Sequence, residues 1–293
     1  MKPTIAVVFA ALLALIAVEP TSAADGKIAV VAAENFYGDL AKQIGGDQVI
    51  VTSIMSNPDQ DPHLFETTPG TVRAIGAAQI VIENGADYDP WMEKILAVTA
   101  HPDRTVINVA KLVGKKPGDN PHLWYDPQTM PAAAKALAEA LSKADPAHKG
   151  DFEARLKTFI ASFESIDEKI AAIRHRYDGT AVTASEPVFG YMAGTLGLKM
   201  RNESFQLSIM NSTEPSAHDV AAFEDDLKHH KVKVMFFNKQ ASDKAVERLV
   251  KLARESKIPV VGVTETEPPG IRYQQWMLDQ LNATEKALAS SSR

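Results

Sequence analysis

The chain of 293 residues contains no cysteine and has a formal net charge of −6, with 31 Lys and Arg against 37 Asp and Glu. Without cysteine it can form no disulfide, thiolate metal site, cysteine nucleophile or lipidated N-terminal cysteine. The mildly acidic balance argues against nucleic acid or an anionic membrane as a partner, and the length suits two domains of ordinary size.

The first residues have the pattern of an export signal. Lys2 precedes an apolar run over residues 5–18, and Ala23 and Ala24 offer small side chains for cleavage. The run is too short to span a bilayer comfortably. We therefore predict a signal peptide over residues 1–23 and a mature chain without a membrane anchor. The periplasm is the expected compartment, and free secretion is the alternative.

The next part of the chain, residues 24–145, alternates between β-branched runs and helix-like stretches. The predicted strands cover residues 28–31, 49–52, 80–82 and 105–107. The predicted helices between them cover residues 35–44, 68–77 and 90–97. Strands that alternate with helices in this way predict a parallel sheet covered on both faces.

A long amphipathic stretch follows, within residues 146–177. From Asp151 to Tyr177, apolar side chains recur at spacings of three and four, at Phe152, Leu156, Phe159, Phe163, Ile166, Ile170 and Ile173. This spacing predicts one helix roughly 40 Å long that links two lobes. An isolated coiled-coil helix is the alternative.

The strand–helix pattern starts again in residues 178–293. Strands are predicted at residues 180–183, 198–201, 232–237 and 258–263, and Ser216 and Asp219 form a capping box that begins a helix ending near Leu227. The expected fold is therefore α/β, with two lobes that each contain a parallel sheet flanked by helices. The single long helix joins them, and the ligand site lies in the cleft between the lobes.

Two loops of the first lobe carry a similar histidine motif. In parallel sheets, ligands bind beyond the carboxyl ends of the strands. Residues 57–66 follow the second predicted strand and residues 118–127 follow the fourth, and each contains Pro-His-Leu followed by an aromatic residue. His63 and His122 are therefore candidate metal ligands. We expect a nearby carboxylate, Glu66 or Asp126, to fix the tautomer of each ring.

Two acidic residues occupy matching positions in the second lobe. Glu186 follows its first predicted strand, and Glu265 follows its last. Two histidines and two carboxylates facing each other across a cleft suit a divalent cation. Glu265 is preferred to Glu267 because it lies nearer the strand end. A structural role at a helix start is the alternative for Glu186.

These motifs resemble those of the metal-specific solute-binding proteins of bacterial ABC importers that serve zinc, manganese and iron. Asp61-Pro-His63 and Pro121-His122-Leu-Trp resemble the first two ligand loops of that family, Glu186-Pro-Val-Phe-Gly-Tyr191 resembles the third, and Thr264-Glu265-Thr266 the fourth. The resemblance covers essentially the whole mature chain. It implies capture of a divalent metal and its delivery to an ABC importer permease. A monomer is expected, because one carrier presents one face to its transporter.

The ligand set bears on the choice of metal. Zinc-specific members usually have His where this chain has Glu186, and the fourth position is usually Asp where this chain has Glu265. Residues 114–120 contain no histidine, although zinc-type members often have a His-rich loop there. Carboxylate oxygens suit Mn2+, whereas intrinsic affinity rises towards Zn2+. We expect Mn2+ first and Zn2+ next, with Fe2+ as a third candidate.

A carrier is expected, not an enzyme. A metallohydrolase is the main alternative, but it needs an open coordination position and a separate base. The chain has no Gly-x-Ser-x-Gly, His-Glu-x-x-His or Walker motif. A third hypothesis for the function is a binder of an organic solute, or an adhesin with the same scaffold.

Overall fold

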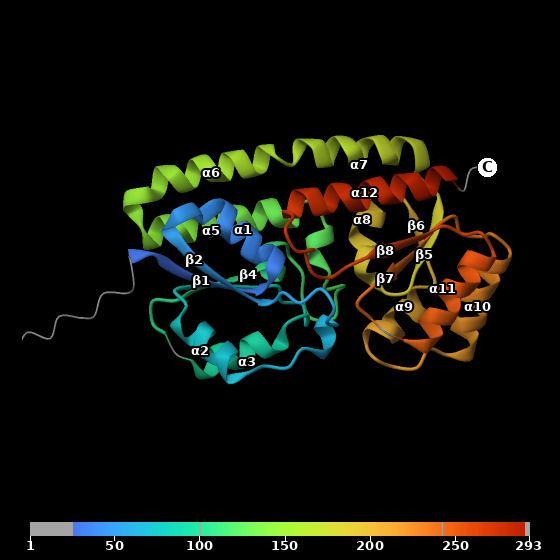
Figure 1. Cartoon of the computed structure of the whole chain (residues 1–293), viewed down its shortest axis with the longest axis horizontal. Helices are drawn as coiled ribbons and strands as arrows, with labels where there is room; N and C mark the ends of the chain where they lie inside the picture. Colours follow the sequence, from blue (N-terminus) through green and yellow to red (C-terminus); the bar gives the residue numbers. More distant parts are fainter. Residues whose placement is uncertain (1–25, 100, 242, 291–293) are drawn as a thin grey trace, which may run out of the picture.

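Two four-stranded parallel sheets, one in each lobe, form the frame of the molecule (Figure 1). The computed structural model describes residues 26–99, 101–241 and 243–290. The predicted signal peptide, residues 1–23, lies outside the described residues. Within them, no helix is both long and apolar enough to cross a membrane.

The first sheet has the strand order β2-β1-β3-β4. Its strands are β1 (Ile28–Glu34), β2 (Val49–Met55), β3 (Ile80–Glu83) and β4 (Thr105–Asn108). All four predicted strands of this lobe are confirmed. The Val, Ile and Ala side chains of β1 and β3 are almost all buried, as expected for a sheet covered on both faces.

Helices cover both faces of this sheet. They are α1 (Asn35–Gly45), α2 (Pro69–Ala77), α3 (Pro90–Val98), α4 (Val109–Leu112) and α5 (Thr129–Ala144). The side chains of α1 and α5 pack on one face with Val30 and Ile82, and those of α2 and α3 pack on the other with Val31 and Val81. Helix α5 is not among the predicted helices, because alanine makes up much of its buried face.

The second sheet repeats the topology, in the order β6-β5-β7-β8. Its strands are β5 (Ala181–Ala184), β6 (Lys199–Arg201), β7 (Met235–Asn238) and β8 (Val260–Val263). The surrounding helices are α8 (Gly190–Thr195), α9 (Glu203–Met210), α10 (Ala217–Lys228), α11 (Lys244–Glu255) and α12 (Tyr273–Ser290). Ser216 caps α10 as predicted, since its Oγ accepts the N–H of Asp219 at 3.1 Å.

The linking segment is divided into two helices, α6 (Lys149–Ala161) and α7 (Glu164–Tyr177), where the sequence predicted one. At the junction, Ser162 Oγ donates to Phe159 O at 2.6 Å, and Phe163 N donates to Ile160 O at 3.1 Å. This tighter turn interrupts the α-helical ladder. Both junction residues keep right-handed helical backbone angles, so α6 and α7 together still run across both lobes (Figure 1).

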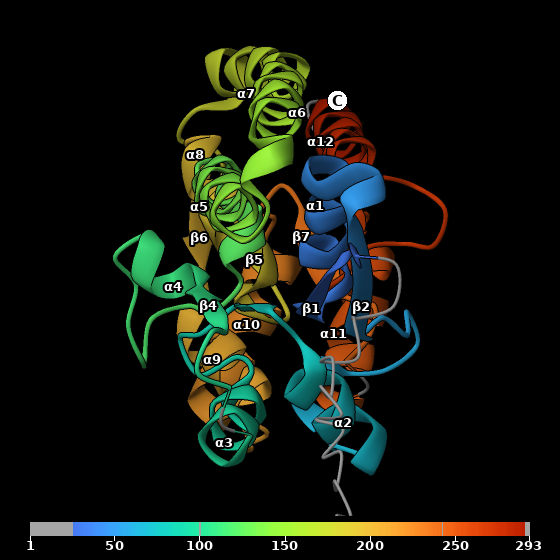
Figure 2. The ribbon, with the colours of Figure 1, turned by 90° about the vertical axis from the view of Figure 1, so that its left-hand side faces the viewer.

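A second element, α12, also joins the lobes. It packs against α7, α1 and β8, and Glu285 on α12 forms ion pairs with Lys169 and Arg176 of α7. Figure 2, which looks along the long axis, shows α6 and α7 at one edge above α5 and α12, with α2 and α3 at the other edge.

One hydrophobic core continues through both lobes. Aromatic rings connect its two halves. The distance between ring centroids is 4.7 Å for Phe36 and Trp124, 5.3 Å for Tyr125 and Phe189, and 4.6 Å for Phe189 and Phe236. Phe36, Trp124 and Tyr125 belong to the first lobe, whereas Phe189 and Phe236 belong to the second. The lobes are therefore packed together in addition to being connected by helices.

Candidate metal centre

The candidate centre lies between the carboxyl ends of the two sheets. His63 sits in a single 3₁₀ turn, η3 (Pro62–Leu64), after β2. His122 precedes a second such turn, η4 (Leu123–Tyr125), after β4. Glu265 follows β8 of the other lobe. The topology brings these loops to the place where parallel sheets bind their ligands.

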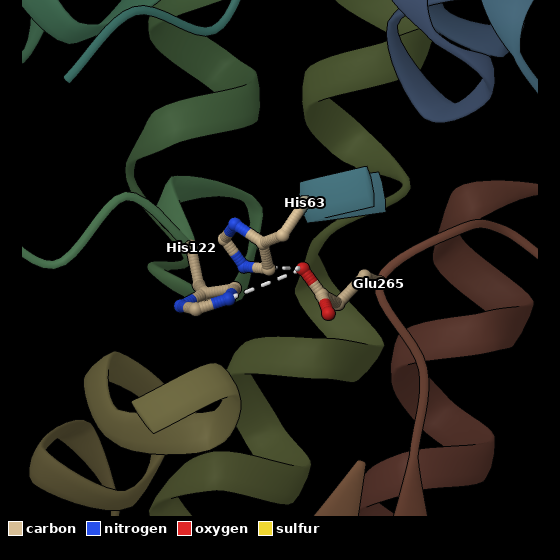
Figure 3. A group of neighbouring side chains, drawn as sticks. All are labelled: His63, His122 and Glu265. Carbon is tan, nitrogen blue, oxygen red and sulfur yellow. Dashed lines mark ion pairs between the residues drawn. The ribbon is translucent and has the colours of Figure 1, made fainter. Parts of the chain in front are cut away.

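Three of the four predicted ligands lie together (Figure 3). Glu265 Oε2 is 3.4 Å from His63 Nε2 and 3.3 Å from His122 Nε2. Within the described residues, this is the one group of three or more His, Asp or Glu whose ligand atoms all lie within 4.8 Å of one another. The side chains of His122 and Glu265 are fully buried, and that of His63 is 18% exposed.

His63 is positioned by the residues that precede it. The carboxylate of Asp61 accepts the backbone N–H of His63 at 2.9 Å, and Pro62 begins the turn. The imidazole then packs edge-on against Tyr88, with 5.4 Å between the ring centroids. This local chemistry explains why an Asp-Pro-His sequence directs the ring towards the cleft.

His122 is held by an amide. Its Nδ1 lies 2.7 Å from Asn120 Oδ1, and Asn120 Nδ2 donates to Pro187 O at 2.8 Å. Because Oδ1 can only accept, Nδ1 of His122 carries the proton, and in the neutral ring Nε2 presents a lone pair to the centre. Burial lowers the pKa of His122, which favours the neutral ring that a metal needs.

The carboxylates expected to fix the two imidazoles do not do so. Asp126 accepts the backbone N–H of Gln128 at 3.1 Å instead of reaching His122, and Glu66 is exposed. Asn120 stands in for Asp126 because it lies two residues before the histidine, where its side chain also accepts the His122 N–H at 3.1 Å. This part of the prediction was wrong.

Glu265 receives hydrogen bonds from both lobes. Tyr88 Oη donates to its Oε2 at 2.9 Å, and Asn238 Nδ2 donates to its Oε1 at 2.5 Å. Burial works against the charged carboxylate, but the protonated forms of His122 and His63, together with the Tyr88 hydroxyl, outweigh it and lower the pKa of Glu265 to about 2. Glu265 is therefore ionised at neutral pH.

Glu186 lies beside the group but outside it. Asn238 Nδ2 donates to Glu186 Oε2 at 2.6 Å, so one amide bridges Glu186 and Glu265. Burial, and then the charge of Glu265, raise the pKa of Glu186 to about 8. The predicted fourth ligand is thus adjacent to the centre and turned towards Asn238.

Glu267, the other candidate for the fourth position, is not part of the group. Its backbone N–H donates to Asn35 Oδ1 at 2.9 Å, and Asn35 Nδ2 donates to its carbonyl oxygen at 2.7 Å. Burial and the charge of Asp39 raise the pKa of the Glu267 carboxyl to about 9. Glu267 fastens its loop to the first lobe through its backbone.

Sequence reasoning missed the residues that support the ligands. Tyr88, Asn120 and Asn238 all contact a predicted ligand side chain, and none was singled out. Asn238 could have been found, since it ends β7 and the strand-end rule applies to it as to Glu186.

The chemistry of the group suits a transition metal. Two imidazole nitrogens and a carboxylate oxygen converge, and neither histidine Nε2 has a hydrogen-bond partner among the described residues. Electron pairs that face one another in a buried site repel unless a positive charge lies between them. A divalent cation bound by nitrogen and oxygen ligands meets that need.

Known proteins are similar to this chain in sequence and in fold. Over residues 30–287 the chain matches the family described as "Zinc-uptake complex component A periplasmic", ZnuA. It is 26% identical over 243 residues to the manganese-binding lipoprotein MntA of Bacillus subtilis (strain 168), covering 79% of this chain and 78% of MntA. It is 25% identical over 288 residues to the iron ABC transporter substrate-binding lipoprotein MtsA of Streptococcus pyogenes serotype M1, covering 89% and 90%.

The fold agrees. The solved structure of the periplasmic zinc-binding protein TroA from Treponema pallidum matches with a TM-score of 0.75 at 20% identity, covering 90% of this chain and 99% of TroA. These comparisons confirm the resemblance that the ligand motifs indicated. The chain therefore belongs to the ZnuA family of metal-binding substrate-binding proteins of ABC transporters.

Proposed function

We propose that this protein captures one divalent transition-metal ion between its lobes and delivers it to the permease of an ABC importer. His63, His122 and Glu265 are the proposed ligands. One observation carries the proposal: two buried imidazole Nε2 atoms without hydrogen-bond partners among the described residues both face Glu265 Oε2, at 3.4 and 3.3 Å. Cargo chemistry of this kind fits a family made of transport proteins.

Glu186 is the proposed fourth ligand. Its carboxylate is buried and shares the amide of Asn238 with Glu265, so it lies next to the ligand group. A bound cation favours the ionised carboxylate against the effect of burial. Together with Glu265, it gives a set of two nitrogen and two carboxylate ligands.

Mn2+ is the proposed physiological cargo, with Zn2+ as the strongest competitor and Fe2+ third. Carboxylates bind Mn2+ well and can raise its coordination number by binding through both oxygens. Zn2+ has the higher intrinsic affinity for such a site, so selectivity depends on supply as well as on ligands. The relatives named above include a manganese and an iron binder, and the solved neighbour binds zinc.

The proposed setting is the periplasm, where the mature chain acts as a monomer without a membrane anchor and without nucleic acid. A carrier role is favoured over a metallohydrolase by the surroundings of the three ligands. Glu267 is the candidate for a general base in the Glu265 loop, but its backbone is tied to Asn35 and its carboxyl lies outside the ligand group. Hydrolysis requires a base within reach of a metal-bound water.

A competition experiment tests the proposal. Mature protein stripped with a chelator is offered equimolar Mn2+, Fe2+ and Zn2+ anaerobically at neutral pH, and bound metal is counted by elemental analysis. We expect about one metal per chain, a shift towards Zn2+ in Glu186→His, and no change in Glu267→Gln. Absence of bound metal from the wild-type chain would overturn the proposed function and favour an organic solute.

A further inference from the structure

The segment that carries His63, residues 57–65 (the His63 loop), packs through His63 and Phe65 on Tyr88 and Trp91 but has few hydrogen bonds to its surroundings. Its hydrogen bonds are mostly internal, such as His63 N to Asp61 Oδ1 and Leu64 N to Asp61 O. In the described parts of the chain, one hydrogen bond ties this loop to a residue outside it: Gln240 Nε2 donates to Gln60 O at 2.9 Å. The loop belongs to the first lobe, and Gln240 belongs to the second.

Gln240 is oriented by bonds on both sides of its amide. It is 8% exposed and follows β7. Its Oε1 accepts the backbone N–H groups of Glu265, at 2.6 Å, and Thr266, at 3.1 Å. Two N–H donors therefore fix the oxygen end, and Nε2 must face the opposite way, towards Gln60 O and Thr266 Oγ1. One side chain thus connects the loops of two proposed ligands.

The other ligand loop has independent support. Residues 264–267 (the Glu265 loop) are bound to the first lobe by Tyr125 Oη, which donates to Thr264 O at 2.9 Å, and by the pair of hydrogen bonds between Asn35 and Glu267. Tyr88 adds a bond to the Glu265 side chain. The Glu265 loop is therefore hydrogen-bonded to both lobes, whereas the His63 loop, which also packs through its rings, has the single hydrogen bond from Gln240.

The surface beside the His63 loop provides a path to solvent. A cleft of about 570 Å³ is lined by Asp61 and Leu64 from this loop and by Glu186, Glu214 and Asp243 from the second lobe. Leu64 is 65% exposed, so the outer side of the loop is unpacked. We expect displacement of the loop to open the centre to this cleft, whose carboxylates attract a cation.

We propose that Gln240 is a positioning residue that holds the His63 loop closed, and that opening of this loop, without separation of the lobes, lets the metal ion in and out. The inference rests on the proposed function. Gln240 Nε2 and Gln60 O are not among the proposed ligand atoms, so their bond contributes to the barrier in both directions. Loss of the bond therefore speeds association and dissociation together.

Two substitutions at Gln240 separate its roles. Gln240→Glu keeps an oxygen for the N–H groups of Glu265 and Thr266 but loses the donor to Gln60, whereas Gln240→Met loses both. Gln43→Met is the matched control, because Gln43 and Gln274 also exchange hydrogen bonds across the lobes, at 3.0 Å each, away from the ligand group. If Gln240→Met fails to fold, Gln240→Glu still tests whether the hydrogen bond from Gln240 to Gln60 holds the His63 loop closed.

The measurement uses the full mature chain and Zn2+ as the probe. Dissociation is followed by stopped flow with a chromophoric chelator, and the dissociation constant by competition with the same chelator. We expect both rate constants of Gln240→Glu to rise about threefold to tenfold, the range for one lost hydrogen bond, with the dissociation constant within about twofold of wild type. Gln43→Met should match wild type in both rates.

Three results would overturn the proposal that Gln240 holds the His63 loop closed. Faster association with unchanged or slower dissociation in Gln240→Glu would indicate a charge effect alone. Equal acceleration in Gln43→Met would indicate general loosening of the lobes. Unchanged hydrogen exchange of a peptide covering residues 57–65 in both Gln240 variants would also exclude it, and that measurement needs no metal. Failure of the wild-type chain to bind Zn2+ is a different outcome, which contradicts the proposed function itself.

Discussion

At the scale of single residues, the amide of Asn238 decides how two buried carboxyls coexist. Its Nδ2 donates to both Glu186 Oε2 and Glu265 Oε1. A proton on Glu186, whose pKa is raised to about 8, relieves the remaining repulsion. The centre therefore balances two acidic groups with one hydrogen-bond donor and one proton, and a metal cation can replace the proton.

Asn238→Asp is expected to destabilise the metal-free protein. It exchanges the bridging donor for a third carboxyl, at a cost of roughly 1–3 kcal/mol in the free energy of unfolding. Added Zn2+ or Mn2+ should restore more stability to this variant than to wild type. Urea unfolding with chelator and with metal checks this. The control for a general effect of added charge is Asn35→Asp, because Asn35 is hydrogen-bonded to the backbone of Glu267 and lies away from the ligand atoms.

The raised pKa of Glu186 predicts a specific dependence of the free energy of unfolding on pH. Since its folded pKa, about 8, lies above its ordinary value, the folded state binds an extra proton between roughly pH 4.5 and 8. Wild-type stability in chelator should therefore fall relative to Glu186→Gln as pH rises through this window, by up to about 1.4 kcal/mol per pH unit, and then level off. Equal pH profiles of the two proteins would contradict the burial of a protonated Glu186.

Metal affinity should have the opposite dependence on pH. The ligands His63 and His122 must be unprotonated to bind, so affinity is expected to fall as pH drops through the histidine range. Chelator competition at about pH 7 and about pH 5 measures this. Constant affinity over that range would argue against two histidine ligands.

At the scale of elements, the junction between α6 and α7 is supported by packing. Phe163 is 4% exposed and contacts the rings of Phe159 and Tyr273, the latter on α12. Substitution by alanine leaves a cavity where the linking helices meet the second lobe-spanning helix. The junction thus depends on a side chain that the predicted apolar stripe already contained.

Phe163→Ala is expected to lower the free energy of unfolding by about 3–5 kcal/mol. Leu156→Ala, on the same stripe but only partly buried, should cost less than half as much. Thermal unfolding followed by circular dichroism compares the two. Equal losses would mean that the stripe is uniformly packed and that the junction has no special role.

At the scale of the whole molecule, the shared core restrains the lobes. The aromatic contacts from Phe36 to Phe236 cross the boundary between lobes, and α12 spans it a second time. Separating the lobes would expose these buried rings at a large cost in hydrophobic free energy. Metal exchange through a loop avoids that cost.

Small-angle scattering of chelator-treated and metal-loaded protein is therefore expected to give nearly superimposable profiles. A clear compaction on loading would show a wide hinge motion and contradict the restraint by the shared core. Gln43→Met serves as a comparison, since it weakens one lobe-to-lobe contact without touching the ligands.

The sequence by itself determined the α/β alternation, the two lobes and the loops that carry His63, His122 and Glu265. Periods of two and 3.6 residues are local properties, and the carboxyl ends of parallel strands gather their loops in one place. Tertiary structure decided the rest: that Asn120 holds His122, that Asn238 bridges Glu186 and Glu265, and that one core joins both lobes. These contacts depend on packing between segments far apart in the chain, which spacing in the sequence does not encode.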